Sequence, residues 1–316
     1  MKKIFITPRS FLTHGKEYVK QMEDMGYEVI ANDTGKQYSR DEFVKHAKEA
    51  TGIVLGVEKM DSELLSQCKN LRVIVKYGVG IDNIDFEYAR GHDIIVDRCA
   101  GSNSQSVAEM AIGFMFAMAK HIPDVSASVK NGGWERVYCM ELMGKTIGVV
   151  GFGDIGTRVA KMAHGIGMNV LASATRPIPM EKLREFCAEN VTLDEILERS
   201  DVISLNVPLT DKTRNMIGKE QFKKMKNTAI LVNTARGGVV NEKDLLEALK
   251  EGQIAACATD VFTSEPPVYE PWVKELLALD NFVLTPHMAS RTVESDINVT
   301  TMCSEKLIGH LKRMRI

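Results

Sequence analysis

The sequence lacks a long hydrophobic run, an excess of charge of either sign and any secretion signal. Its most apolar stretch, residues 110–119, is about half as long as a bilayer span requires, so we expect no membrane-spanning segment. Forty basic and forty-two acidic side chains leave a formal charge of −2, which gives no general attraction for nucleic acid or an anionic membrane. The first residues lead directly into the strand-like Ile4-Phe5-Ile6-Thr7 without an apolar signal region. We therefore expect a cytoplasmic protein.

The sequence also lacks paired cysteines. Its six cysteines are scattered, and no two of them form a C-x-x-C pair. This distribution favours reduced thiols in a reducing compartment over a disulfide framework or a zinc site, and we expect no metal. Free cysteine commonly behaves as a small buried hydrophobe. We interpret the following as packing residues: Cys68, Cys99, Cys139, Cys187, Cys257 and Cys303.

Short runs rich in valine and isoleucine alternate with amphipathic helical patterns along the 316 residues. This alternation indicates an α/β protein with parallel sheets built from βαβ units. The first series of predicted strands consists of Lys3–Thr7, Glu28–Ala31, Gly52–Gly56, Arg72–Lys76 and Ile94–Asp97. The second series consists of Thr146–Val150, Asn169–Ala172, Val202–Asn206, Ala229–Asn233, Ala256–Asp260 and Phe282–Thr285.

The two series open in the same way, with a strand, a helix and a second strand that follows a glycine. We therefore expect two similar folds in tandem, each with its own sheet. A helix-forming segment from about Ser104 to Lys130 looks like the connector between them. The final amphipathic segment, Arg291–Arg315, either continues the second sheet or crosses back onto the first domain.

A glycine-rich turn follows the first strand of the second series. Gly151-Phe152-Gly153-Asp154-Ile155-Gly156 matches G-x-G-x-x-G and opens a helical run. In this context Gly151 allows the tight turn, Gly153 the approach of a pyrophosphate, and Gly156 close packing of helix on strand. Helix N-terminal amides then face the phosphates. The turn predicts dinucleotide binding, with a purely structural turn as the alternative.

The strand that follows does not end in the Asp or Glu that would hold the ribose 2′-hydroxyl of NAD. It continues instead as Ser173-Ala174-Thr175-Arg176. This segment lacks a charge that would repel a 2′-phosphate and adds a guanidinium that can bind one. We therefore favour NADP over NAD. The alternative is that Arg176 is a solvated surface residue and that cofactor choice is loose.

Three later segments each follow a strand of the second series, where ligands of a doubly wound sheet bind. They carry Arg236, Glu265 and His287. Reduction of a 2-oxo acid needs a cation for the substrate, a proton donor near neutral pH and a hydride source. Arg236, His287 and a nicotinamide would supply these in turn. A carboxylate beside the imidazole raises its pKa and orients it, which is the role we expect for Glu265.

The chain resembles the D-isomer-specific 2-hydroxyacid dehydrogenases over essentially its whole length. The resemblance rests on several independent motifs in the family's order. These motifs are Tyr77-Gly78-Val79-Gly80-Ile81-Asp82-Asn83-Ile84-Asp85, Ser106-Val107-Ala108-Glu109, the glycine-rich turn, Asn206-Val207-Pro208-Leu209-Thr210, Asn233–Gly238, Asp260–Pro267 and Thr285–Ser290.

This resemblance implies that Arg236, Glu265 and His287 form the catalytic set, and that Asp260 contacts the nicotinamide carboxamide rather than capping a helix. It favours the crossing back of the last helix. The expected domains are then a flavodoxin-like substrate domain (1–102 and 288–316) and an NAD(P)-binding Rossmann domain (103–287). The expected cofactor-binding residues are Gly151, Gly153, Asp154, Ile155, Gly156, Ala174, Thr175, Arg176, Val207, Pro208, Thr234, Ala235 and Asp260.

The resemblance further implies that the backbone of Tyr77, Gly78, Val79 and Gly80 binds the substrate carboxylate. It also implies a homodimer formed by the helix from Ser104 to Lys130 and the arm around Trp134. Within the family the chain is most similar to 3-phosphoglycerate dehydrogenases. Lys76 and Arg136 stand at positions where a cation would bind the substrate phosphate, Arg136 across the dimer.

Several departures raise glyoxylate or hydroxypyruvate reduction as the runner-up activity. Gly56 stands where many phosphoglycerate dehydrogenases place an arginine, and Asp154 puts an unexplained negative charge near the pyrophosphate. The chain ends at Ile316, before the regulatory domain that many of those enzymes carry. From another functional class, an NAD(H)-sensing corepressor or a degenerate binding module is less favoured, because the catalytic set is intact.

Overall fold

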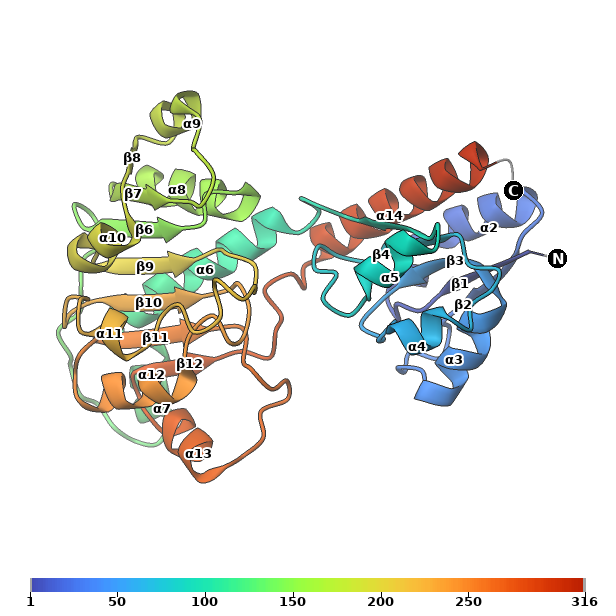
Figure 1. Ribbon diagram of the computed structural model, residues 1–316. Helices are drawn as coiled ribbons and strands as arrows, with labels where there is room; N and C mark the ends of the chain where they lie inside the picture. Colours follow the sequence, from blue (N-terminus) through green and yellow to red (C-terminus); the bar gives the residue numbers. More distant parts are fainter. Residues whose placement is uncertain (1, 315–316) are drawn as a thin grey trace. The chain divides into compact units, whose positions relative to one another are not determined.

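The computed structural model describes residues 2–314 and divides the chain into two compact units. Unit 1 comprises Met1–Asn103 and Arg291–Ile316, and unit 2 comprises Ser104–Ser290. Each unit is built on one sheet in which every paired strand is parallel (Figure 1). The predicted α/β class with two parallel sheets is therefore confirmed.

Unit 1 has a five-stranded sheet in the order β2-β1-β3-β4-β5. Strand β2 therefore lies on one side of β1, and β3, β4 and β5 follow in order on its other side. Ligands of such a sheet bind outside the carboxyl ends of the strands at this reversal, here between β1 and β3. The elements are β1 (Lys3–Ile6), α1 (Phe11–His14), α2 (Lys16–Asp24), β2 (Glu28–Ala31), α3 (Arg40–Glu49), β3 (Ala50–Leu55), α4 (Ser62–Leu65), β4 (Val73–Lys76), α5 (Phe86–Gly91), β5 (Ile95–Arg98) and α14 (Val293–Arg313).

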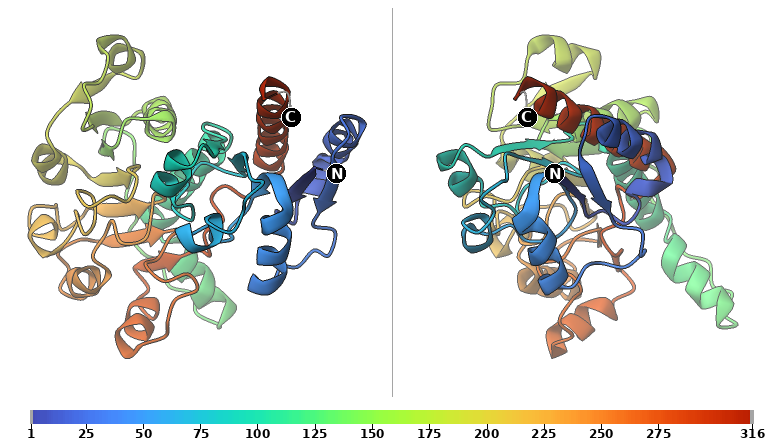
Figure 2. Two further views of the ribbon diagram at one scale, coloured as in Figure 1. Left: turned by 45° about the vertical axis from the view of Figure 1, so that its right-hand side comes forward. Right: turned by 90° about the vertical axis from the view of Figure 1, so that its right-hand side faces the viewer.

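Alternating strand residues bury both faces of this sheet, as the strand period of two requires. Phe5 and Ile53 pack with Phe43 of α3 on one face, whereas Ile4 and Leu307 belong to the core of the other face. The last helix, α14, therefore covers the same sheet as the N-terminal elements, as both views in Figure 2 show. The segment that we expected to cross back lies in unit 1.

An ion-pair cluster ties α14 to the edge strand β5. The carboxylate of Asp97 accepts hydrogen bonds from Lys306 Nζ (2.7 Å) and from His310 Nε2 (2.9 Å). Burial by itself would raise the pKa of Asp97, but these hydrogen bonds outweigh it and hold that pKa at about 2.

Unit 2 has a seven-stranded sheet in the order β12-β11-β10-β9-β6-β7-β8, with the reversal between β6 and β9. This is the doubly wound order of a Rossmann sheet with one further strand at its edge. The elements are α6 (Ser104–Ala119), α7 (Ile122–Lys130), β6 (Thr146–Val150), α8 (Asp154–Gly165), β7 (Asn169–Ser173), α9 (Met180–Glu185), β8 (Ala188–Asn190), α10 (Leu193–Arg199), β9 (Val202–Leu205), α11 (Lys219–Phe222), β10 (Ile230–Asn233), α12 (Glu242–Lys250), β11 (Ala256–Thr259), α13 (Pro271–Leu277) and β12 (Phe282–Leu284).

Two details of unit 2 differ from the prediction. The helix-forming segment 104–130 is two helices, because His121 takes a left-handed φ of 53° and Pro123 restricts the residue before it. Strand β8 was not predicted, since its three residues are partly or fully exposed and carry no apolar alternation.

The cysteine interpretation holds for four of the six residues. Cys68, Cys99, Cys257 and Cys303 are buried, while Cys139 and Cys187 are exposed. In residues 2–314, every helix is too short or too polar to cross a membrane.

Candidate active site

The loops that follow β11 and β12 bring His287 and Glu265 into direct contact. His287 Nδ1 lies 2.6 Å from Glu265 Oε2. The other carboxylate oxygen, Oε1, accepts the amide of Phe262 at 3.0 Å, so the carboxylate is held at both ends. Both side chains remain partly accessible, His287 at 46% and Glu265 at 38%. The pair is therefore a fixed dyad that can still be reached by a small molecule.

The dyad is arranged to keep a proton on the imidazole. The hydrogen bond that His287 donates to the Glu265 carboxylate raises the pKa of His287 and outweighs the opposite effect of burial. Burial would raise the pKa of Glu265, but its hydrogen bonds with His287 and with the Phe262 amide lower it. A raised histidine pKa beside an ionised carboxylate provides a proton donor near neutral pH.

Asp260 holds the loop that carries His287. Its carboxylate, in a residue only 1% exposed, accepts hydrogen bonds from Thr285 Oγ1 (2.5 Å), Met288 N (2.9 Å) and Ala289 N (2.7 Å). The amide of His287 donates to the Asp260 carbonyl at 2.9 Å. These bonds fix His287 at a φ of 50°, a left-handed conformation that non-glycine residues rarely adopt. Sequence reasoning missed this positioning role, because the donors lie 25 to 29 residues away.

Arg236 lies on the loop after β10, which Asn233 closes. The Asn233 amide donates to the Arg236 carbonyl (3.1 Å) and its oxygen accepts from Ala235 N (3.0 Å). A Cβ on Gly237 would lie 2.1 Å from the carbonyl oxygen of Phe262, so the Arg236 loop packs directly on the loop that leads to Glu265. The positive charge of Arg236 is close enough to lower the pKa of both members of the dyad. The structure thus brings the three predicted catalytic residues together.

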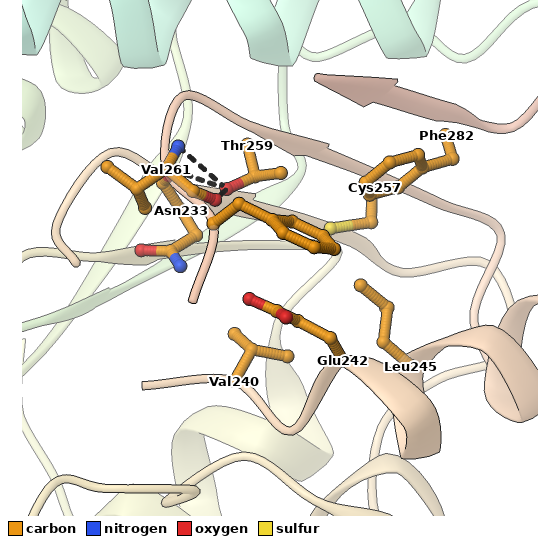
Figure 3. A pocket seen from close by; sticks show the side chains of 9 residues that line it. Asn233, Val240, Glu242, Leu245, Cys257, Thr259, Val261 and Phe282 are labelled. Atoms are coloured by element: carbon orange, nitrogen blue, oxygen red, sulfur yellow. Dashed lines mark hydrogen bonds between the residues drawn. The ribbon is translucent and has the colours of Figure 1, made fainter. Parts of the chain in front are cut away.

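A partly buried carboxylate that was not predicted supports the same loops. Glu242, at the start of α12, accepts the amide (2.7 Å) and the hydroxyl (2.9 Å) of Thr263. Burial raises the pKa of Glu242. Figure 3 shows its carboxylate at a small internal cavity that Val240, Leu245 and Cys257 also line. No spacing pattern in the sequence singles out this residue, because its partner is 21 positions away.

The glycine-rich turn has the backbone that its sequence predicts. Gly151 has a φ of 93°, and a Cβ there would lie 2.4 Å from the carbonyl oxygen of Asn206. A Cβ on Gly156 would lie 2.0 Å from the carbonyl oxygen of Gly151. Gly153 is the N-cap of α8 and has open space where a Cβ would be. The turn therefore leaves the first amides of α8 approachable by an anion.

The remaining predicted cofactor residues lie at the same carboxyl edge of the unit 2 sheet, after β6, β7, β9, β10 and β11. Two buried polar atoms there, Thr234 Oγ1 and Asn206 Oδ1, have no hydrogen-bond partner within the described residues. Buried polar atoms are normally paired, so these atoms fit a bound polar ligand. The residues in question are Asp154, Ile155, Ala174, Thr175, Arg176, Val207, Pro208, Thr234, Ala235 and Asp260.

The predicted substrate residues are divided between the two units. Lys76 and the segment Tyr77–Gly80 follow β4 in unit 1, whereas Arg136 is an exposed residue of unit 2. Lys76 Nζ donates to the Gly56 carbonyl and to Asn83 Oδ1. Lys76 and Arg136 therefore belong to different units, and their joint role in binding a phosphate stays a prediction.

Known proteins are similar to this chain in sequence and in fold. Residues 112–289 match the model of the D-isomer specific 2-hydroxyacid dehydrogenase, NAD binding domain. The chain is 41% identical over 304 residues to D-3-phosphoglycerate dehydrogenase of Archaeoglobus fulgidus, covering 95% of this chain but 56% of that protein. It is 40% identical over 281 residues to hydroxypyruvate reductase of Thermotoga maritima, covering 88% of this chain and 90% of that protein.

Among solved structures, D-lactate dehydrogenase of Aquifex aeolicus, complexed with NAD and lactic acid, superposes with a TM-score of 0.85. It is 29% identical and matches 99% of this chain and 96% of that one. The fold and the motifs define a two-domain dehydrogenase architecture. The chain belongs to the D-isomer specific 2-hydroxyacid dehydrogenase family.

Proposed function

We propose that this chain transfers a hydride between a nicotinamide dinucleotide and a 2-oxo acid or the corresponding D-2-hydroxy acid. The observation that carries the proposal is the 2.6 Å contact between His287 and Glu265, which lies at the same sheet edge as the glycine-rich turn. The bound nicotinamide would supply the hydride. All other steps are performed by groups of this chain.

Each member of the catalytic set has a distinct task. Arg236 binds the carboxylate and the carbonyl oxygen of the substrate, which orients the carbon that accepts the hydride. His287, held protonated by Glu265, donates a proton to the carbonyl oxygen as it becomes a hydroxyl. In the reverse direction the neutral imidazole accepts that proton. Asp260 positions the His287 loop, and its predicted contact with the nicotinamide carboxamide stays a prediction.

The proposed cofactor is NADP in preference to NAD. Ala174 and Arg176 lie just after β7 and are exposed, and Arg176 has no partner within the described residues. A charge-assisted hydrogen bond from Arg176 to a 2′-phosphate is worth about 1.5–3 kcal/mol, or about 10- to 150-fold in affinity. NADPH should therefore bind more tightly than NADH, and Ala174→Asp combined with Arg176→Ala should reverse this preference. Arg184→Ala, which removes another exposed arginine, serves as the control.

Asp154 fits this site as a stabiliser of the helix. It lies exposed in the first turn of α8, where a carboxylate interacts favourably with the helix macrodipole. The same charge repels a pyrophosphate, so we propose that it moderates cofactor affinity. The helix amides and glycines remain the binding elements.

Unit 1 is the proposed substrate-binding domain and unit 2 the proposed cofactor domain. The boundaries of these units lie within three residues of the predicted limits 1–102, 103–287 and 288–316. The backbone of Tyr77–Gly80 is the proposed carboxylate site, and Lys76 and Arg136 are the cations proposed for a phosphorylated substrate. Relatives named for 3-phosphoglycerate and for hydroxypyruvate make both substrates candidates.

We also propose a cytoplasmic homodimer. Exposed apolar side chains gather on α7 and on the arm that follows it, including Ile122, Val129, Trp134 and Tyr138. Trp134 is 80% exposed, which is uncommon for a large apolar residue outside an interface. Sedimentation of the full chain and of Trp134→Glu tests this, and a parent monomer at micromolar concentration would refute it.

A screen of NADPH and NADH oxidation tests the activity. The substrates are 3-phosphohydroxypyruvate, hydroxypyruvate, glyoxylate, pyruvate and 2-oxoglutarate. Turnover of at least one substrate should fall by about 10²- to 10⁴-fold in His287→Ala, the range for loss of a positioned proton donor. His164→Ala, at an exposed position of α8, should remain active. Cofactor binding without turnover of any of these acids would favour a sensing protein instead.

A further inference from the structure

A buried carboxylate lies at the strand reversal of unit 1, where the sheet order places a ligand site. Glu58 follows β3, is only 7% exposed, and its Oε2 accepts a hydrogen bond from the hydroxyl of Thr7 at 2.5 Å. Thr7 follows β1. The contact therefore joins the two strand ends on either side of the reversal, and no role proposed above uses it.

The loop that carries Glu58 is held rigidly. Asn83 Nδ2 donates to the carbonyls of Gly56 (3.2 Å) and Glu58 (2.6 Å), and Lys76 Nζ also donates to the Gly56 carbonyl. The Gly56 amide donates to Thr7 Oγ1 at 2.8 Å. Glu58 consequently lies beside the loop after β4, whose segment Tyr77–Gly80 is the proposed binding site for the substrate carboxylate.

The carboxylate takes space where a side chain at position 56 would begin. A Cβ built on Gly56 would lie 3.1 Å from Glu58 Oε2 and 3.2 Å from Thr7 Oγ1. An arginine at position 56 would therefore require Glu58 to move. In this chain the site has an anionic acceptor close to the place where a phosphate-binding cation was expected.

The hydrogen bonding of Glu58 is incomplete. A carboxylate has about four acceptor positions, and in residues 2–314 this one receives a single hydrogen bond, at Oε2. The other oxygen, Oε1, is therefore unpaired within the described residues. A largely buried carboxylate with an unpaired oxygen accepts a hydrogen bond strongly from a neutral donor and disfavours an anion.

We propose that Glu58 is a specificity residue that selects a short 2-oxo acid carrying a hydroxyl group on C3. The hydroxyl donates to Glu58, whereas a phosphate at the same place is repelled and a methyl group leaves the carboxylate unpaired. Lys76 Nζ donates to the Gly56 carbonyl and to Asn83 Oδ1, which holds this ammonium beside the loop that carries Glu58. This inference depends on the proposed function and narrows it to one substrate class.

The test compares kcat/KM of the full chain for hydroxypyruvate, pyruvate and 3-phosphohydroxypyruvate. A hydrogen bond to a charged group is worth about 10- to 150-fold, so hydroxypyruvate should exceed pyruvate by that factor. It should also exceed 3-phosphohydroxypyruvate. Glu58→Gln should reduce the hydroxypyruvate to pyruvate ratio by about tenfold and raise kcat/KM for the phosphorylated substrate. The matched control is Glu63→Gln, on the exposed side of α4.

Three results would overturn the inference. These are equal use of pyruvate and hydroxypyruvate by the parent, a parent preference for the phosphorylated acid, or a Glu58→Gln effect that is the same for every substrate. The order of the three substrates by kcat/KM in the parent tests the inference even if the variant folds poorly. If the parent reduces none of the acids, the proposed function itself fails, which is a separate outcome.

Arg9 provides an internal check, because it is an exposed cation two residues after Thr7. If a phosphate were bound here after all, Arg9→Ala would lower kcat/KM for 3-phosphohydroxypyruvate specifically. We expect Arg9→Ala to leave the ratio of hydroxypyruvate to pyruvate unchanged. A specific loss for the phosphorylated acid, together with parent preference for it, would identify a phosphate site and refute the role of Glu58.

Discussion

Removing the Asp260 carboxylate should uncouple the His287 loop from the rest of unit 2. In Asp260→Ala, the amides of Met288 and Ala289 and the hydroxyl of Thr285 lose their acceptor. The Thr285 hydroxyl can rotate to another partner. Met288 is 42% exposed, so its amide can recover a hydrogen bond from water, whereas Ala289 is 4% exposed and its amide cannot readily do so.

The loss of stability in Asp260→Ala is therefore dominated by one buried unpaired donor, the amide of Ala289, which costs about 1–3 kcal/mol. This is a fraction of the roughly 5–15 kcal/mol that stabilises a domain, so the variant should fold. At about 2–4 °C per kcal/mol for a domain of this size, Tm should fall by about 2–12 °C. Without these bonds His287 can leave its left-handed conformation, which costs about 1–3 kcal/mol to maintain. We expect kcat to fall by about tenfold or more.

Three measurements separate positioning from contact with the nicotinamide. A positioning role predicts faster amide hydrogen exchange at Met288 and Ala289 and a lower kcat, with the dissociation constant of NADPH nearly unchanged. Thr285→Val, which leaves both amides paired to Asp260, should retain most of the stability. If Asp260→Ala had the same Tm, amide exchange rates and kcat as the parent, the reasoning would be refuted. A large loss of NADPH affinity would instead support the nicotinamide contact implied by the family resemblance.

Three further predictions concern other parts of the chain. Glu265→Gln should lower the pKa of His287, so the fall of reductive kcat with rising pH should move to lower pH; an unchanged pH profile would contradict the dyad. Gly156→Ala should weaken NADPH binding and lower Tm, because its Cβ would lie 2.0 Å from the Gly151 carbonyl oxygen; titration and melting test it. Asp97→Asn should lower the free energy of unfolding by about 2 kcal/mol at pH 7. The pKa of Asp97 is about 2 in the folded chain against an ordinary 3.8. The ionised carboxylate therefore stabilises the fold above pH 4, and this contribution disappears as the pH falls towards 2. The difference in free energy of unfolding from the parent should therefore vanish in acid.

The sequence is most informative where a backbone constraint leaves few alternatives. Gly151 and Gly156 were predictable because neither tolerates a Cβ, and the G-x-G-x-x-G spacing encodes that geometry directly. The strands were predictable because valine and isoleucine fill both faces of parallel sheets. The break at His121 was less visible, since Ser104–Lys130 has helical composition on both sides of it.

Side chains that act through distant partners were harder to predict. Glu265 and His287 are 22 residues apart, and their positions after strands of one sheet, together with the order of family motifs, suggested that they meet. Glu58 and Glu242 escaped notice because their partners, Thr7 and Thr263, are 51 and 21 residues away. A lone glutamate in a polar stretch ordinarily indicates a solvated surface. Its burial depends on tertiary packing, which local periodicity does not report.

The two units contain comparable carboxylates that differ in how completely they are hydrogen-bonded. Asp260 lies on the loop after β11 and accepts three hydrogen bonds from the loop after β12, two of them from backbone amides. Glu58 joins the loops after β1 and β3, yet its carboxylate accepts one, from Thr7, within the described residues. A carboxylate with several protein donors is stabilised without a ligand, and its removal should chiefly affect stability and loop geometry. One with a single donor gains more from a substrate hydroxyl, so its removal should chiefly change which acid is reduced. The number of donors therefore assigns a positioning role to Asp260 and a selective role to Glu58, and the contrast between their two variants tests both assignments.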